Sequence, residues 1–361
     1  MPAAPEEGNP VRWNDIYINA AAACMGTTVR TADAVADGRY DPEERERSGY
    51  HAVRVTDGGS ESAVDLAVTA GNRALERAGL DLADYRLLLH ASISHQGLDD
   101  FAPAPHVQSR TIRGSATAME VRQASNGGMA ALELAAAYLA VRESPDSVLL
   151  TTADRFVPPG WDRFGTAAGV LLGDAGTSIV LSRQPGVARL LSSVAIGDTT
   201  YEGLQTGDAE WTDMPGGDGW PIDSQHRVDA FVAQHGADIF IELVQSLWRN
   251  ETDGMARALA DAGATTGDIA AWVFPNMGEG LTDWDARKAF GVDLTRTSWE
   301  WGREQGHLGA GDQFATLAHL WETRQVRTGD LVFLNGAGTG FSFSSAVVEI
   351  TGEPDWPSST D

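Results

Sequence analysis

The order of apolar segments along the 361-residue chain restricts its fold more than any other feature. Short apolar runs alternate with longer stretches in which apolar residues recur at helical spacing, which is typical of proteins that pack helices against a sheet. Helices are expected at residues 61–79, 126–142, 228–262 and 313–326. Strands are expected at 15–24, 85–92, 147–154 and 270–276, with strand pairs at 168–183 and 330–350. This alternation predicts the α/β fold class.

The segments that close the two halves of the chain resemble each other. VLLGDAGTSIVLS closes the first half of the chain and FLNGAGTGFSFSSAVVEI closes the second, and each has the pattern of a strand, a turn of small residues and another strand. The likeness predicts two related halves, residues 1–185 and 186–361, in one pseudo-symmetric protein. Residues 198–225 fit neither half's pattern, and are either a lid over a binding site or a covering for the sheet.

Charge and composition exclude several classes of function. The net charge of -25 repels nucleic acid and anionic lipid, so neither is an expected partner. A single cysteine, Cys24, excludes an intrachain disulfide and a multi-cysteine metal site, and its apolar surroundings predict a buried structural thiol. No apolar run is long enough to span a membrane, and the acidic N-terminus does not resemble a secretion signal. We therefore expect a cytoplasmic protein without a metal.

Ser125 begins the expected helix at 126–142, in the segment VRQASNGGMAALELA. One interpretation is that Ser125 or Asn126 is the helix N-cap. The other is that Ser125 is a nucleophile, because the free N–H groups and partial positive charge of a helix N-terminus stabilise a developing oxyanion. Gly127 and Gly128 would then let the backbone approach a substrate. Position alone leaves both interpretations open.

A serine nucleophile needs a base, because its hydroxyl is almost never ionised near neutral pH. Among the eight histidines, His307 stands out because it lies in the Gly-rich turn GHLGAGD and not on an apolar helix face. Asp312, five residues later, could hold the imidazole and stabilise its protonated form. The alternatives are that His307 is a loop histidine bonded to backbone, and that Asp312 is the N-cap of the helix at 313–326.

Taken together, these segments resemble the ketosynthase III enzymes of the thiolase fold, in the same order and over nearly the whole chain. The family's nucleophile opens a buried central helix, as Ser125 does here. Its Gly-Asp-Gly-Ala turn corresponds to residues 173–176, and its closing Gly-rich loop corresponds to residues 338–341. The resemblance implies a thiolase fold built from two pseudo-symmetric α-β-α-β-α halves.

The three side chains that the family uses for catalysis are all different here. Its cysteine is Ser125, its histidine is Asn276 and its asparagine is His307. A relocated triad of Ser125, His307 and Asp312 resembles a serine-dependent subgroup from aromatic polyketide pathways, of the daunorubicin–doxorubicin starter-unit type. The family's histidine and asparagine donate to the thioester carbonyl, and here the side-chain amide of Asn276 could donate in their place, as could His307. The resemblance also implies that the backbone amides of Ser125, Gly338 and Thr339 form the oxyanion hole.

The resemblance implies an acyltransferase that moves a short acyl group, propionyl or acetyl, from CoA through an acyl-serine to an acceptor. Starter-unit priming by condensation with a malonyl carrier protein is the first expectation. Transfer to a carrier thiol or a sugar or other hydroxyl without condensation is the second, and an inactive thiolase-fold partner subunit is the third.

Binding residues and partners follow from the same resemblance. Arg155, Arg163 and Arg249 are candidates for the phosphates of CoA. No cofactor is expected to stay bound, because acyl-CoA is the substrate. The resemblance further implies a homodimer and allows an acyl carrier protein as a partner.

Overall fold

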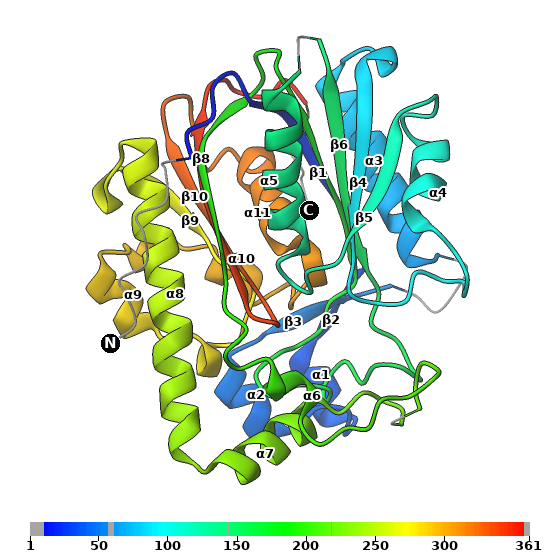
Figure 1. Cartoon of the computed structure of the whole chain (residues 1–361), viewed down its shortest axis with the longest axis vertical. Helices are drawn as coiled ribbons and strands as arrows, with labels where there is room; N and C mark the ends of the chain where they lie inside the picture. Colours follow the sequence, from blue (N-terminus) through cyan, green and yellow to red (C-terminus); the bar gives the residue numbers. More distant parts are fainter. Residues whose placement is uncertain (1–10, 57–60, 143–144, 218, 357–361) are drawn as a thin grey trace.

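The computed structural model describes residues 11–56, 61–142, 145–217 and 219–356. These residues form one large sheet in the order β5-β4-β6-β7-β1-β8-β11-β10-β9 (Figure 1). The strands of the first half are β1 (Tyr17–Met25), β4 (Tyr85–Ala91), β5 (Thr117–Val121), β6 (Ser147–Asp154) and β7 (Ala175–Ser182). Those of the second half are β8 (Ala188–Gly197), β9 (Ile269–Val273), β10 (Leu331–Gly338) and β11 (Ser342–Ile350).

The sheet repeats one arrangement on either side of its centre. In the first half β6 is parallel to β4 and antiparallel to β7, and β7 is antiparallel to β1. In the second half β10 is parallel to β9 and antiparallel to β11, and β11 is antiparallel to β8. The two arrangements meet where Tyr17 and Ile18 pair with Arg189 and Ala188. The expected division of the chain after residue 185 falls in the connection between β7 and β8.

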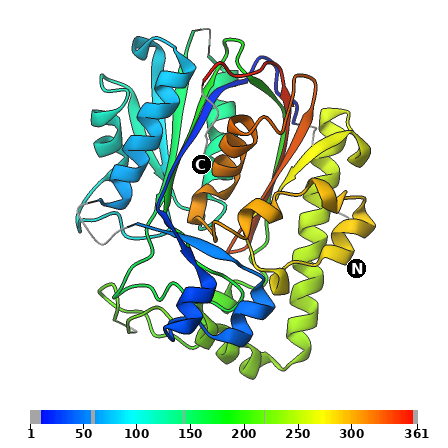
Figure 2. The same cartoon turned by 180° about the vertical axis from the view of Figure 1, so that it is seen from behind.

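Helices complete five layers in the order α-β-α-β-α, as Figures 1 and 2 show from opposite sides. Helices α5 (Gly127–Ala140) and α11 (Asp312–Glu322) lie in the middle layer, between the two halves of the sheet. The outer face of the first half is covered by α3 (Ala63–Ala78), with α4 (Pro103–Arg110) beside it. The outer face of the second half is covered by α8 (Asp238–Ala262). This layering is the thiolase fold that the sequence predicted.

Local chemistry explains why the best predicted elements form. Helix α3 begins with a capping box between Ser62 and Asp65 and ends at Gly79, which has left-handed backbone angles. Every residue of β6 and β7 is buried, as expected for strands with helices on both faces. The predictions of a helix at 61–79 and of strands at 85–92 and 147–154 are confirmed.

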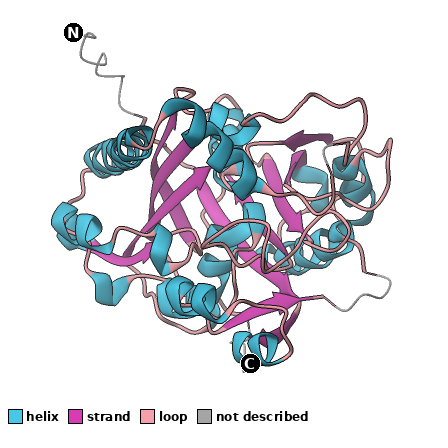
Figure 3. Cartoon of the chain, turned by 90° about the horizontal axis from the view of Figure 1, so that it is seen from below, coloured by secondary structure: helices cyan, strands magenta, loops and turns pink. Residues whose placement is uncertain are grey.

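Smaller elements cover the lower end of the sheet in Figure 1, and Figure 3 views the molecule from that end. A separate hairpin is formed by β2 (Thr27–Arg30) and β3 (Ala52–Val55). The short helices are α1 (Thr31–Ala36), α2 (Pro42–Ser48), α6 (Gly203–Thr206), α7 (Ser224–His235), α9 (Trp284–Phe290) and α10 (Trp299–Gly302). Single 3₁₀ turns occur at Leu82–Asp84, Thr266–Asp268, Glu279–Leu281, Leu294–Arg296 and Gly309–Gly311. No helix in the described ranges has both the length and the apolar character needed to cross a bilayer.

Two predictions about elements were wrong or incomplete, and one long strand was missed. Only the second strand of the pair expected at 168–183 forms, because Leu171 and Gly173 bond to the backbone of His307 instead of to a neighbouring strand. The helix expected at 228–262 is two helices, which Gly236 separates with a backbone angle that ends α7. Strand β8 was not predicted, since buried serines interrupt its apolar pattern.

Candidate active site

The turn before α5 presents the hydroxyl of Ser125. Ala124 has a positive φ of 47°, which is uncommon for a residue other than glycine and reverses the chain sharply before the helix. The N-cap of α5 is Asn126, and it makes no capping bond through its side chain. The hydroxyl of Ser125 lies 2.8 Å from Nε2 of His307. Of the two residues expected as the N-cap, Asn126 takes that position and Ser125 does not.

Ser125, His307 and Asp312 form one continuous hydrogen-bonded chain. Nδ1 of His307 lies 2.6 Å from Oδ2 of Asp312, on the opposite side of the imidazole from Ser125. His307 and Asp312 are buried, at 3% and 1% exposure, while Ser125 is half-buried and can be reached from solvent. The expected triad is thus brought together, with its carboxylate innermost and its hydroxyl outermost.

The carboxylate of Asp312 is held by backbone and does not cap α11. Its Oδ1 accepts a hydrogen bond of 2.6 Å from the amide of Leu308, and its Oδ2 accepts one of 2.8 Å from the amide of Asn276. These donors come from two separate loops and hold the carboxylate within hydrogen-bond distance of His307. The alternative interpretation of Asp312 as a helix cap is wrong.

Close packing of α5 against the turn at 309–311 brings the two halves of the site together. A Cβ on Gly128 would collide with the carbonyl of Ala310, so only glycine allows this approach. The backbone of His307 is fixed on both sides, since its amide bonds to Leu171 and its carbonyl accepts from Gly173. The alternative interpretation of His307 as a loop histidine with only backbone partners is wrong, because both of its ring nitrogens have side-chain partners.

The electrostatic environment prepares His307 to carry a proton. Burial lowers the pKa of this imidazole, but the charge of Asp312 and the hydrogen bond to it outweigh burial and raise the pKa above its usual value. An imidazole with a raised pKa is a stronger base toward a hydroxyl, and its protonated form is stabilised by the adjacent carboxylate. The arrangement can therefore take the proton of Ser125 as the oxygen attacks.

Asn276 lies behind the triad and contacts it through its backbone amide. Its side-chain Nδ2 donates to the carbonyl of Gly306 at 3.0 Å, and its backbone amide holds Asp312. Asn276 is only 1% exposed, and the hydroxyl of Tyr50 donates to its backbone carbonyl at 2.5 Å. One N–H of this amide is thus used by loop packing behind the triad, and the donor role expected of Asn276 toward a thioester stays a prediction.

The Gly-rich loop at 338–341 lies against the nucleophile turn. A Cβ on Gly338 would fall 2.6 Å from the carbonyl oxygen of Gln123 and 2.9 Å from the amide nitrogen of Asn126. Thr339, the next residue, is exposed. This proximity is compatible with an oxyanion hole made by backbone amides, and the donor roles of Ser125, Gly338 and Thr339 stay predictions.

The three arginines proposed for CoA phosphates lie in different surroundings. Arg163 is 9% exposed, and its guanidinium makes two bonds of 3.0 and 2.9 Å to the two carboxylate oxygens of buried Asp174. Arg155 donates to Oγ1 of Thr56, and Arg249 is exposed on α8. The assignment of Arg163 to a phosphate is wrong, since its charge is already paired inside the protein.

Replacing Arg163 with alanine should therefore lower stability and leave CoA binding unaffected. The substitution would leave the buried carboxylate of Asp174 without its ion-pair partner, which lowers the free energy of unfolding by about 3–5 kcal/mol. Thermal unfolding is the measurement, with Arg249→Ala as an exposed control that changes stability by less than about 0.5 kcal/mol. A normal melting temperature together with a raised KM for acyl-CoA would show that Arg163 does bind CoA.

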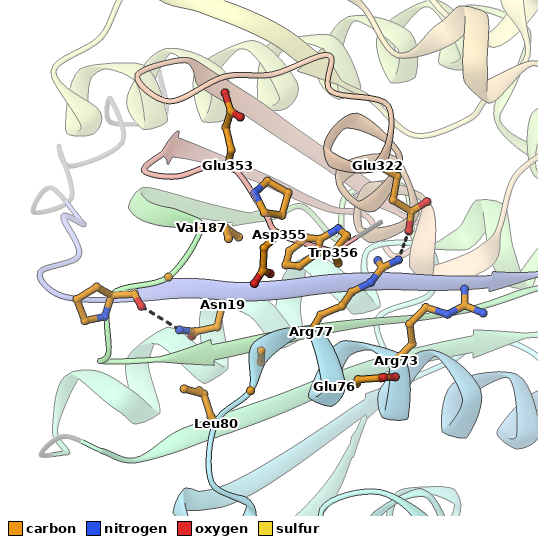
Figure 4. A pocket seen from close by; sticks show the side chains of 15 residues that line it. Asn19, Arg73, Glu76, Arg77, Leu80, Val187, Glu322, Glu353, Asp355 and Trp356 are labelled. Atoms are coloured by element: carbon orange, nitrogen blue, oxygen red, sulfur yellow. Dashed lines mark hydrogen bonds and ion pairs between the residues drawn. The ribbon is translucent and has the colours of Figure 1, made fainter. Parts of the chain in front are cut away.

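Two other features lie apart from the triad. Cys24 lies in β1, half-buried, and burial raises the pKa of its thiol. A cleft of about 1040 Å³ lies between the end of α3 and residues 353–356, and Figure 4 shows Arg77 paired with Glu322 at its wall. The cleft's lining contains no residue of the triad.

Comparison with known proteins identifies the family of the chain. Residues 259–350 match the family model of the 3-oxoacyl-[acyl-carrier-protein] synthase III C-terminal region. The chain is 28% identical over 304 residues to the β-ketoacyl-[acyl-carrier-protein] synthase III of Roseiflexus castenholzii, covering 84% of this chain and 87% of that one. It is 26% identical over 314 residues to the same enzyme of Synechococcus sp. strain RCC307, covering 85% and 89%.

Solved structures extend the likeness to the whole fold. The structure of ChlB3, described as an acyltransferase, matches with a TM-score of 0.87 and 31% identity, over 94% of this chain and 99% of that chain. The priming β-ketosynthase of the R1128 polyketide pathway matches with a TM-score of 0.74 and 19% identity, over 97% and 100%, which shows a shared fold. This protein belongs to the ketosynthase III family of thiolase-fold enzymes. Members of that family transfer or condense acyl groups and use acyl-CoA and acyl carrier protein.

Proposed function

We propose that this protein transfers a short acyl group from CoA, through an ester on Ser125, to a hydroxyl or thiol acceptor without condensation. The observation that carries the proposal is the chain of hydrogen bonds from Ser125 through His307 to Asp312. Propionyl and acetyl are the acyl groups that the sequence resemblance favours.

The first half of the reaction forms the acyl-enzyme. Nε2 of His307 takes the hydroxyl proton as Oγ of Ser125 attacks the thioester carbon, and the oxyanion is held by backbone amides at the start of α5 and in the loop at 338–341. The carbon–sulfur bond then breaks, and CoA leaves as a thiol after His307 returns the proton to sulfur. Asp312 stays ionised and stabilises the imidazolium in between.

The second half transfers the acyl group. His307 takes the proton of the acceptor, whose oxygen or sulfur attacks the ester carbon, and Oγ of Ser125 leaves with that proton. The acceptor is esterified or thioesterified, and the enzyme returns to its starting state.

The position of Asn276 favours this transfer over the condensation that the sequence favoured first. Decarboxylation of a malonyl thioester needs side-chain donors on the enolate that forms. Here the amide of Asn276 is bonded to Gly306, and both ring nitrogens of His307 are engaged within the triad. The 31% identity with a protein described as an acyltransferase supports the same choice.

An inactive partner subunit is the least favoured function. Loss of activity would be accompanied by loss of contact between Ser125 and His307, whereas these side chains lie within hydrogen-bond distance and both loops around them are held by backbone bonds.

The unpaired edge of β5 supports the homodimer that the resemblance implies. This strand ends the sheet, pairs with β4 alone among the described strands, and keeps most of its residues exposed. An open sheet edge of this kind is suited to pair with the same edge of a second copy. Sedimentation of the full chain tests the proposal, since a monomer at micromolar concentration would exclude it.

Acylation should depend on pH through His307. The base works only when neutral, and its raised pKa places the rising limb of the acylation rate above pH 6.5. The same shift makes the protonated histidine stabilise the fold below its unfolded-state pKa, and this stabilisation is lost as pH rises through the folded-state value. The measurement is the single-turnover acylation rate between pH 5 and 9. A midpoint of its rise below pH 6.5 would contradict a raised pKa for His307.

The acceptor is tested after acylation. The propionylated enzyme is isolated and mixed separately with carrier protein, sugar alcohols and malonyl carrier protein. The proposal predicts acyl transfer to a thiol or hydroxyl, and no carbon dioxide release from malonyl carrier protein. Carbon dioxide release at the rate of acyl loss would establish condensation instead.

A further inference from the structure

A second buried carboxylate lies directly behind the triad. Asp154 is the last residue of β6 and has no exposed surface. Its Oδ1 accepts bonds of 2.7 Å from the amides of both Ile93 and Ser94, and its Oδ2 accepts one of 2.9 Å from the amide of Ala310. One side chain therefore ties the end of a rigid central strand to the turn that connects His307 with Asp312.

The fit of Asp154 against this turn is close. Gly309 has a φ of 64°, and a Cβ there would collide with the carboxylate of Asp154. Glycine is thus required both by the backbone angle and by the space that the carboxylate occupies. The turn cannot shift away from β6 without losing the bond from Ala310.

The partners of Asp154 are those of an ionised group. All of its backbone partners are N–H donors, which suit the acceptor-only oxygens of a carboxylate. The pKa of Asp154 is nonetheless raised, because burial outweighs the amides of Ser94, Ala310 and Ile93, which lower it. The charge of Asp154 also adds to that of Asp312 in raising the pKa of His307.

We propose that Asp154 is a positioning residue for the proposed acyl transfer: it fixes the turn that carries His307 and stabilises the protonated imidazole with its charge. The inference rests on the proposed function, in which His307 becomes protonated as Ser125 attacks. Asp154 touches neither the nucleophile nor the substrate in this scheme. It acts on His307 by holding the turn at 308–311 and by the electrostatic effect of its negative charge.

Other charged groups around the turn are already paired or point elsewhere. On the α11 side the charge is Asp312, already within the triad. Before β7, Asp174 is paired with Arg163, and on β3 the guanidinium of Arg54 bonds to Gln305. At the start of α5 the adjoining residues are the uncharged Gly127 and Gly128. Asp154 is therefore the group whose removal should change the field at His307 without breaking the triad.

The test is the pH titration of His307 in the full-length Asp154→Asn variant. Asparagine keeps the shape and an acceptor for Ile93 and Ser94, but it removes the charge and the acceptor for the amide of Ala310. The titration midpoint, followed by histidine NMR with the signal assigned by its loss in His307→Asn, should fall by roughly half a unit or more. The acylation profile should move by the same amount, with a lower plateau rate.

Asp198→Asn is the matched control. Asp198 is a half-buried carboxylate with three donor partners, Thr200, Ser246 and Asn250, and its charge is not among those acting on His307. Its replacement removes the same charge from the chain and should leave the midpoint unchanged.

An unchanged midpoint in Asp154→Asn, with the acylation rate reduced equally at every pH, would overturn the inference, because that is what a structural role alone predicts. Since the NMR titration needs no turnover, it decides the role of Asp154 even if Ser125 is never acylated. If Asp154→Asn does not fold, Asp154→Ser is titrated in its place, with the same two outcomes.

Discussion

Acylation of Ser125 should fall by roughly 10⁴-fold when His307 is replaced with alanine. The hydroxyl would then have no base at 2.8 Å, and its own acidity is far too low to supply an alkoxide near neutral pH. The measurement is the single-turnover rate with propionyl-CoA and acetyl-CoA, followed by intact-protein mass.

His51→Ala is the control for this change. His51 is exposed and bonds to Glu304 on the surface, so its loss should leave the acylation rate within about twofold. If the His307→Ala variant acylated at the rate of the unmodified chain, His307 would not be the base.

The second large effect is expected from Asp312→Asn, which should lower the acylation rate by about 10³–10⁴-fold. An asparagine amide would donate toward Nδ1 of His307, where the carboxylate now accepts at 2.6 Å. The ring would then carry its proton on Nε2 and could not accept the proton of Ser125. The fold should survive, because the asparagine carbonyl can still accept from the amide of Leu308 or Asn276.

Exposed Asp285 on α9 offers a matched replacement with asparagine that should leave the acylation rate unchanged. For Asp312→Asn, the melting temperature and the acylation rate must be compared with each other. A normal melting temperature with lost acylation supports a catalytic carboxylate. A normal rate would show that Asp312 has only a structural role.

Much of the fold could be predicted because its strongest elements are encoded locally. The helix at 61–79 carries both of its boundary signals, at Ser62 and Gly79, and strands such as 147–154 are apolar and short. Strand β8 could not be predicted in the same way. It is held by pairing with β11 and not by a period of its own apolar residues.

The triad could be predicted because each of its residues departs from its local pattern. Ser125 opens an apolar helix, and His307 and Asp312 flank the turn Leu308–Gly311, which contains two glycines. Their contact spans 182 residues and depends on the approach of α5 to the turn at 309–311, which comes from tertiary packing. The three residues could be identified from the sequence, but the contact between Ser125 and His307 could not be predicted from it.

The errors concern side chains whose partners are set by tertiary packing. Arg163 was assigned to a phosphate, yet it pairs with Asp174 across a loop whose course the sequence did not reveal. The bond from the amide of Asn276 to Gly306, thirty residues away, was likewise not predicted. Asp154 was missed, although a carboxylate ending a fully buried strand was a signal that it needed donors from elsewhere.

The mass of the full chain after incubation with propionyl-CoA tests the central claim most directly. The account predicts one added propionyl group, located on Ser125 by peptide fragmentation and absent from Ser125→Ala. An unmodified chain after incubation with propionyl-CoA and with acetyl-CoA, or an acyl group found on Cys24, would contradict it.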